Sequence, residues 1–243
     1  MQPFVKIYDN PQLLAHSLSL EIAHRSAFSK KHRQSLNLAL SGGTTPTLLF
    51  ETMAQSLYNT QIHWKNIRFF WGDERCVPPQ DPQSNFGVVQ QSLFSVISIP
   101  KSRIMRIHGE TKPEKAAENY SKKLTRFLPL NSENIPVFDW ILLGIGTDGH
   151  TASLFPDSDT ITETNFCAVA THPSSGQKRV TLTLPVINAA RRISFLVTGS
   201  EKQKLVSRIL KNEKSVSNLP AAMVHPKNGI LEWWLDADAA KDI

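Results

Sequence analysis

The chain has 243 residues, of which 40% are hydrophobic and 20% charged, the profile of an ordinary globular protein. No run of about 18 apolar residues occurs, and the N-terminus lacks the basic and apolar regions of a signal peptide, so we expect a cytoplasmic protein that is independent of membranes. The net charge of +6 favours anionic partners, but the lysines and arginines are scattered without aromatic interleaving. That pattern argues against nucleic acid and leaves an anionic small molecule as the expected partner.

Short apolar runs alternate with longer amphipathic stretches, which predicts strands alternating with helices. The predicted strands are 4–8, 36–40, 67–71, 139–144, 167–171, 179–184, 193–199 and 229–235, with 102–107 as a weaker candidate. The predicted helices are 10–32, 46–58, 84–96, 112–128, 185–191 and 201–211. Thr45 suits the N-cap of the second helix, with Pro46 at its first position, and Pro113 begins another. This order predicts an α/β fold, a single domain over residues 1–243 with a doubly wound, mainly parallel sheet flanked by helices.

The two cysteines, Cys76 and Cys167, are far apart in the sequence and have no cysteine or histidine neighbour at metal-ligand spacing. We therefore expect two reduced thiols and no metal site.

Polar segments rich in glycine or charge follow four of the predicted strands. In open α/β sheets, ligands bind beyond the carboxyl ends of the strands, so these segments are expected to meet at one edge of the sheet. They are Ser41-Gly42-Gly43-Thr44-Thr45, Asp73-Glu74-Arg75, Gly144 to Thr151, and Gly199 to Lys202.

The first of these segments has the features of an anion site. Residues 41–45 lead into a helix, where free backbone N–H groups, hydroxyls and the positive helix end attract a phosphate. It is not a Walker A loop, because no G-K-[ST] follows. Taken alone, the same residues also fit a tight turn before a capped helix.

The cations and acids of the other segments are open to two interpretations. Asp73 and Arg75 belong either to an exposed ion-pair turn or to a polar site, where Arg75 would bind an anion by charge-assisted hydrogen bonds. Arg179, which opens a strand, and Lys202, which begins a helix, are solvent-facing unless they converge on the same anion.

Asp148 and His150 are the strongest acid–base candidates. A neutral histidine accepts a proton from water at cellular pH. A neighbouring aspartate orients the ring and stabilises its protonated form. A histidine packed under a turn is the alternative.

The stretch Gly144 to Gly149 also satisfies the dinucleotide pattern G-x-G-x-x-G. A dinucleotide fingerprint belongs to the first βαβ unit and is followed about 20 positions later by an acid that holds the ribose. Here the pattern comes late, the residues around position 168 read C-A-V-A-T, and Asp148 would place a carboxylate where a pyrophosphate should sit. The residues therefore disfavour a dinucleotide site.

Together these segments resemble the 6-phosphogluconolactonases, within the wider group that contains glucosamine-6-phosphate deaminases. The matching stretches are LSGGTTP (40–46), FFWGDERCVPPQDPQSNFG (69–87), LLGIGTDGHTASLFP (142–156), RVTLTLPVINAAR (179–191), VTGSEK (197–202) and LPAAMVHPKNGILEWWLD (219–236). They occur in order over nearly the whole chain.

The resemblance implies a Rossmann-like fold of the sugar-phosphate isomerase and lactonase type and a cofactor-free esterase that hydrolyses 6-phospho-D-glucono-1,5-lactone to 6-phosphogluconate in the oxidative pentose phosphate pathway. By position, His150 looks like the general base and Asp148 like its orienting group. The phosphate end looks like Ser41, Gly42, Gly43, Thr44 and Thr45 with Arg179 and Lys202, whereas Asp73 and Arg75 match a site-lining segment. We expect a monomer, although the residues leave a weak homo-oligomer open.

Two other functions remain alternatives. In the sister deaminases an acidic side chain follows shortly after the D-G-H segment, whereas here no acid follows His150 until Asp157, which favours the lactonase. A non-catalytic phosphosugar sensor would keep the anion-binding residues but would need no base, so the Asp148 and His150 pair argues against it.

Overall fold

Mostly apolar runs form the centre of the sheet. The strands β2 (Leu36–Leu40), β5 (Trp140–Leu143) and β8 (Arg192–Val197) are buried along their whole length, as strands covered on both faces must be. In the computed structural model, which describes residues 3–243, they lie in the middle of a six-stranded sheet of order β1-β9-β8-β5-β2-β3. All five neighbouring pairs are parallel. The outer strands are β1 (Phe4–Tyr8), β9 (Ile230–Asp236) and β3 (Ile67–Trp71).

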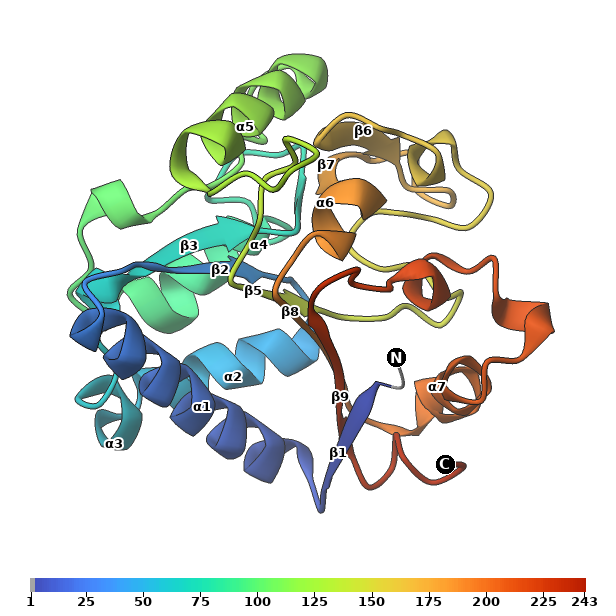
Figure 1. Ribbon diagram of the computed structural model, residues 1–243, viewed down its shortest axis with the longest axis horizontal. Helices are drawn as coiled ribbons and strands as arrows, with labels where there is room; N and C mark the ends of the chain where they lie inside the picture. The colour runs from blue at the N-terminus through green and yellow to red at the C-terminus, as the bar shows by residue number, and fades with distance from the viewer. Residues whose placement is uncertain (1–2) are drawn as a thin grey trace.

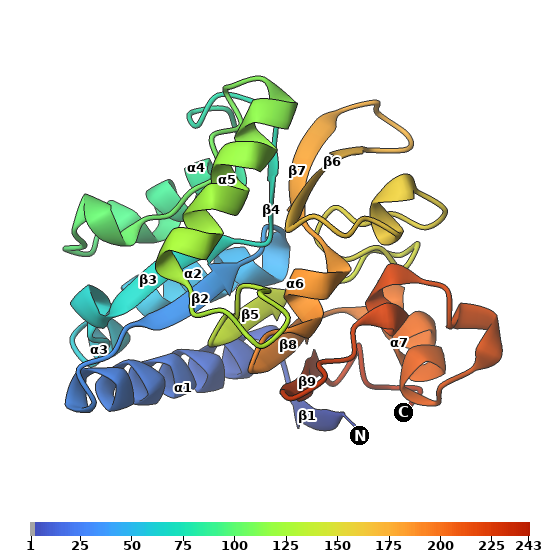
Figure 2. The ribbon, with the colours of Figure 1, turned by 45° about the horizontal axis from the view of Figure 1, so that its top comes forward.

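Helices cover both faces of this sheet (Figures 1 and 2). On one face α1 (Pro11–Lys31) packs against α2 (Thr44–Ala54) and β9. On the other side lie α5 (Pro113–Phe127) and α6 (Leu184–Asn188). The remaining helices are α3 (Ser56–Asn59), α4 (Asn85–Val89) with a π-helical continuation over Gln90–Phe94, and α7 (Gln203–Leu210). None of the helices within residues 3–243 is long and apolar enough to cross a membrane.

The six-stranded sheet confirms the predicted α/β fold with a mainly parallel sheet flanked by helices, and beside it lies a second sheet that was not predicted. The strands β6 (Cys167–Thr171) and β7 (Lys178–Leu182) pair antiparallel with each other, and β7 pairs with β4 (Asp73–Arg75). Gly72 joins the two sheets, because its N–H donates to Leu40 and its carbonyl accepts from Leu182, both at 2.8 Å. The segment Asp73–Arg75 is therefore a strand of its own, whereas it was expected to be a polar segment that follows a strand.

Two smaller predictions were wrong. Helix α2 begins at Thr44 with Gly43 at its N-cap, so Thr45 is not the cap; its hydroxyl instead meets that of Thr198 at 2.6 Å. Residues 102–107 form no strand, but Ile104 makes one parallel bridge to Phe69, and the Met105 N–H donates to the Phe69 carbonyl at 2.8 Å. That bridge covers part of the open edge of β3, which would otherwise expose unpaired backbone groups.

Tyr120 covers another part of that edge, at Trp71, from α5. Its buried hydroxyl donates to the Trp71 carbonyl at 2.8 Å and accepts from the Trp71 N–H at 2.9 Å. Burial raises the pKa of this hydroxyl well above its ordinary value. Tyr120→Phe should lower the free energy of unfolding by about 1–3 kcal/mol, because both backbone groups of Trp71 lose a buried partner. Urea unfolding of the two proteins measures the difference, and an unchanged midpoint would contradict this role.

Candidate functional site

Four adjacent strands bring the predicted segments to one edge of the sheet. The neighbours β8, β5, β2 and β3 are parallel, so their carboxyl ends lie side by side. The segments that follow them are the ones that carry the predicted site residues. The structure therefore gathers all four segments where the parallel topology was expected to place them.

The loop after β5 folds back on itself and presents Asp148 and His150. The Asp148 carboxylate lies 2.6 Å from His150 Nδ1 and accepts from the His150 backbone N–H at 3.1 Å. Partial burial opposes ionisation of Asp148, but these hydrogen bonds and the charge of the ring outweigh it and lower the pKa of the carboxyl. His150 Nε2 makes no hydrogen bond to any residue within 3–243, so it is available to a ligand or water.

The backbone of this loop holds the histidine in place. The Gly146 N–H donates to the His150 carbonyl at 2.9 Å, and the Thr151 hydroxyl donates to the Gly144 carbonyl at 2.8 Å. A Cβ on Gly146 would lie 2.2 Å from His150 Nδ1, so only glycine fits beside the ring. The imidazole also packs against Phe155, with 5.0 Å between ring centroids.

The segment after β2, Ser41–Thr45, forms what we call the glycine–threonine turn. Gly43 and Thr44 are exposed at the start of α2, whose first N–H groups have no partner within the helix. The hydroxyl pair of Thr45 and Thr198 ties this turn to the end of β8. The turn thus has the free donors and the positive helix end of an anion site.

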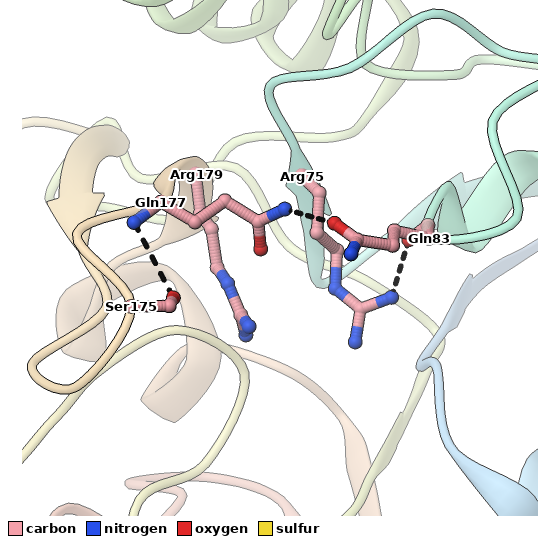
Figure 3. A pocket seen from close by; sticks show the side chains of 5 residues that line it. All are labelled: Arg75, Gln83, Ser175, Gln177 and Arg179. Atoms are coloured by element: carbon pink, nitrogen blue, oxygen red, sulfur yellow. Dashed lines mark hydrogen bonds between the residues drawn. The ribbon is translucent and has the colours of Figure 1, made fainter.

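Arg75 and Arg179 face each other directly across the β4–β7 pair. Figure 3 shows both guanidinium groups pointing into one cavity of about 530 Å³, here named the arginine cavity, which Gln83, Ser175 and Gln177 also line. Nε of each arginine is buried without a hydrogen-bond partner among residues 3–243. Burial lowers the pKa of Arg179, and the nearby Asp73 carboxylate opposes that shift. Two cations held this close favour an anion between them.

Phe155 connects the arginine cavity to the histidine. The Arg179 guanidinium lies 5.7 Å from the centroid of the Phe155 ring, and the imidazoles of His150 and His172 also pack against that ring. One aromatic side chain therefore separates the predicted base from the arginine pair.

Asp73 does not line the arginine cavity, unlike Arg75 and Arg179. It is buried, its Oδ2 accepts from the Ser153 hydroxyl at 2.7 Å, and its Oδ1 accepts from the Asn85 amide at 3.2 Å. Both carboxylate oxygens are thus engaged by the protein itself. Lys202 lies in a short 3₁₀ helix after β8, 3.8 Å from Glu201, and is not among the residues that line the arginine cavity.

Sequence reasoning did not single out several residues that hold this site together. Glu74 is buried, and its carboxylate accepts from the backbone N–H groups of Arg75, Asn85 and Phe86 and from the Ser84 hydroxyl. Burial raises the pKa of Glu74, against the effect of those N–H groups. The sequence pointed to Glu74 and Asn85 only through their position, because both lie within the stretch 69–87 that resembles the family. Within residues 3–243, no group of three or more histidine, cysteine, aspartate or glutamate side chains gathers in a way that would hold a metal.

The chain is similar to a family of known proteins over most of its length. Residues 9–233 match the sequence model of a family described as glucosamine-6-phosphate isomerases/6-phosphogluconolactonase. A 6-phosphogluconolactonase of Haemophilus influenzae is 43% identical over 221 residues, which cover 91% of this chain and 93% of that protein. One from Aggregatibacter actinomycetemcomitans is 45% identical, with 84% and 86% covered. The solved 6-phosphogluconolactonase of Trypanosoma brucei superposes with a TM-score of 0.89 at 29% identity, covering 100% of this chain and 99% of that one.

Proposed function

Because this chain belongs to the glucosamine-6-phosphate isomerase/6-phosphogluconolactonase family, we propose that it hydrolyses 6-phospho-D-glucono-1,5-lactone to 6-phosphogluconate by attack of a water that His150 activates. The observation that carries the proposed mechanism is the Asp148–His150 pair, which leaves Nε2 available at the same sheet edge as the arginine pair.

In the proposed reaction, His150 Nε2 accepts a proton from a water molecule while the water oxygen attacks the lactone carbonyl carbon. Asp148 stabilises the imidazolium that forms. When the tetrahedral intermediate collapses, the bond from the carbonyl carbon to the ring oxygen breaks. The same imidazolium then returns its proton to that leaving oxygen. The products are the open-chain hydroxyl and a carboxylic acid, so protons balance without any further reactant.

The substrate phosphate is proposed to bind to the glycine–threonine turn together with Arg179 and Lys202. Arg75 joins this set because its guanidinium lines the same cavity as that of Arg179. Asp73 is assigned a supporting role, since both of its oxygens are already engaged by Ser153 and Asn85. Binding of the phosphate at a distance from the reacting carbonyl would orient the lactone in front of His150.

The direct test is the rate of lactone disappearance, measured against spontaneous hydrolysis, with purified protein and no added metal or nucleotide. We expect an acceleration that scales with protein concentration. Ammonia release from glucosamine 6-phosphate is measured in parallel, and we expect none, because residues 151–156 after His150 contain no acid. A lactone rate equal to the blank would refute the proposal, and ammonia release alone would identify the sister activity.

A further inference from the structure

Asn85 lies between two parts of the site that are far apart in the sequence. It stands at the start of α4 and is only 2% exposed. Its side-chain N–H₂ group donates to the Asp73 backbone carbonyl at 2.9 Å and to Asp73 Oδ1 at 3.2 Å. These bonds fix which way the amide points, because the reverse orientation would set its oxygen against two other oxygens.

The oxygen of the same amide faces the glycine–threonine turn. Asn85 Oδ1 is buried and has no hydrogen-bond partner among residues 3–243. A Cβ built on Gly42 would lie 2.0 Å from that oxygen, 2.7 Å from Cγ and 3.1 Å from Nδ2. These are the three atoms nearest to it. The φ of Gly42 lies outside the left-handed region, so the Asn85 amide, and not the backbone conformation, is what excludes a side chain at position 42.

Hydrogen bonds to the Glu74 carboxylate hold the backbone of Asn85 and its neighbours in place. Its backbone N–H donates to Glu74 Oε1 at 2.7 Å, and that carboxylate also accepts from the N–H of Phe86 at 2.8 Å. The Ser84 hydroxyl donates to Glu74 Oε2 at 3.1 Å and accepts from the Gly87 N–H at 3.0 Å, which caps α4. A buried carboxylate that accepts from three groups at the start of α4 therefore holds this helix against β4.

From this geometry we propose that Asn85 is a positioning residue, which sets the distance between the glycine–threonine turn and the strand that carries Asp73 and Arg75. The proposal rests on the proposed function, because it assigns Asn85 to the support of the phosphate end of the same site. Asn85 acts through its neighbours: the amide holds Asp73 on one side and limits the approach of Gly42 on the other. The distance between the free N–H donors of the turn and the arginine pair is thereby fixed.

The test is a double-mutant cycle between positions 42 and 85, read by lactone kinetics and by thermal unfolding. Gly42→Ala should raise KM for the lactone roughly tenfold or more, because the added methyl overlaps the amide. Asn85→Ala should raise KM about 3- to 10-fold with kcat changed less than about twofold, because the spacing of the phosphate end relaxes while His150 stays in place. The double variant lacks the three amide atoms that a methyl group at position 42 would overlap. Its KM should therefore be no higher than that of Asn85→Ala.

The cycle is decisive because independent sites give additive effects, whereas groups in contact do not. Additive effects on both KM and melting temperature would overturn the proposal, as would an Asn85→Ala variant with wild-type KM. Asn228→Ala is the matched control, an exposed asparagine that precedes β9 at the opposite end of the parallel strands, and it should behave as wild type. Failure of the proposed function has a different signature, namely wild-type protein that hydrolyses the lactone no faster than the blank.

Discussion

Replacing His150 by alanine is expected to lower kcat for lactone hydrolysis by about 10²- to 10⁴-fold, the usual contribution of a positioned general base. Thermal unfolding should be nearly unchanged, because the ring is partly exposed and its main partner is Asp148 on the same loop. Steady-state kinetics with the background rate subtracted measure the effect. His24→Ala, which removes an exposed histidine from α1, is the matched control and should retain full activity.

The pH dependence of wild-type activity is a second test of His150 as the general base. The hydrogen bonds from His150 hold the pKa of Asp148 below its ordinary value, so the carboxylate is ionised at neutral pH. Activity should therefore show an acid step, because a general base that already carries a proton cannot accept one from water. The residual rate of His150→Ala should lack that step. If His150→Ala kept wild-type kcat and the same acid limb, another group would be the base.

Replacing Arg179 by methionine is expected to weaken substrate binding and, at the same time, to stabilise the free protein. Each charge-assisted hydrogen bond is worth about 1.5–3 kcal/mol, so KM should rise roughly 10- to 150-fold. Without ligand, however, Arg75 and Arg179 are like charges directly opposite each other on paired strands, which is unfavourable. Methionine keeps the apolar stem and removes the charge, so the melting temperature of the ligand-free variant should rise.

Kinetics and thermal unfolding, with and without inorganic phosphate, measure these opposite changes. Phosphate should raise the melting temperature of the wild type more than that of Arg179→Met, because a ligand stabilises the state that binds it. Arg126→Met, an exposed arginine on α5, controls for the loss of a positive charge. A variant with unchanged KM, or one that is destabilised and still binds phosphate like the wild type, would argue against an anion between the two arginines.

The main sheet and the place of the site could be predicted because both are local properties of the sequence. Each central strand is a mostly apolar run, and glycine or polar residues begin where the run ends, as after Leu40 and Leu143. In a parallel sheet those ends must fall on one edge, so the spacing of the runs was sufficient.

The second sheet could not be predicted in the same way. The runs that form β6 and β7 have the same apolar character as the central strands, and periodicity says nothing about direction. The attachment of β7 to β4 depends on Gly72, where the chain passes from one sheet to the other and the Gly72 carbonyl accepts from the Leu182 N–H. Asp73 likewise depends on partners 12 and 80 positions away, Asn85 and Ser153, and no local pattern encodes contacts of that kind.

Gly146 has a consequence for how a sequence pattern should be interpreted. In a dinucleotide site the glycines of G-x-G-x-x-G leave space for a pyrophosphate, whereas here the space beside Gly146 is filled by the imidazole of His150, four residues further along the same loop. Glycine is thus required at position 146 by the His150 side chain and not by a cofactor. In a chain with this loop, a glycine at that position and a histidine four residues later form a single steric unit, and a pattern that records the glycines without the histidine describes only half of it.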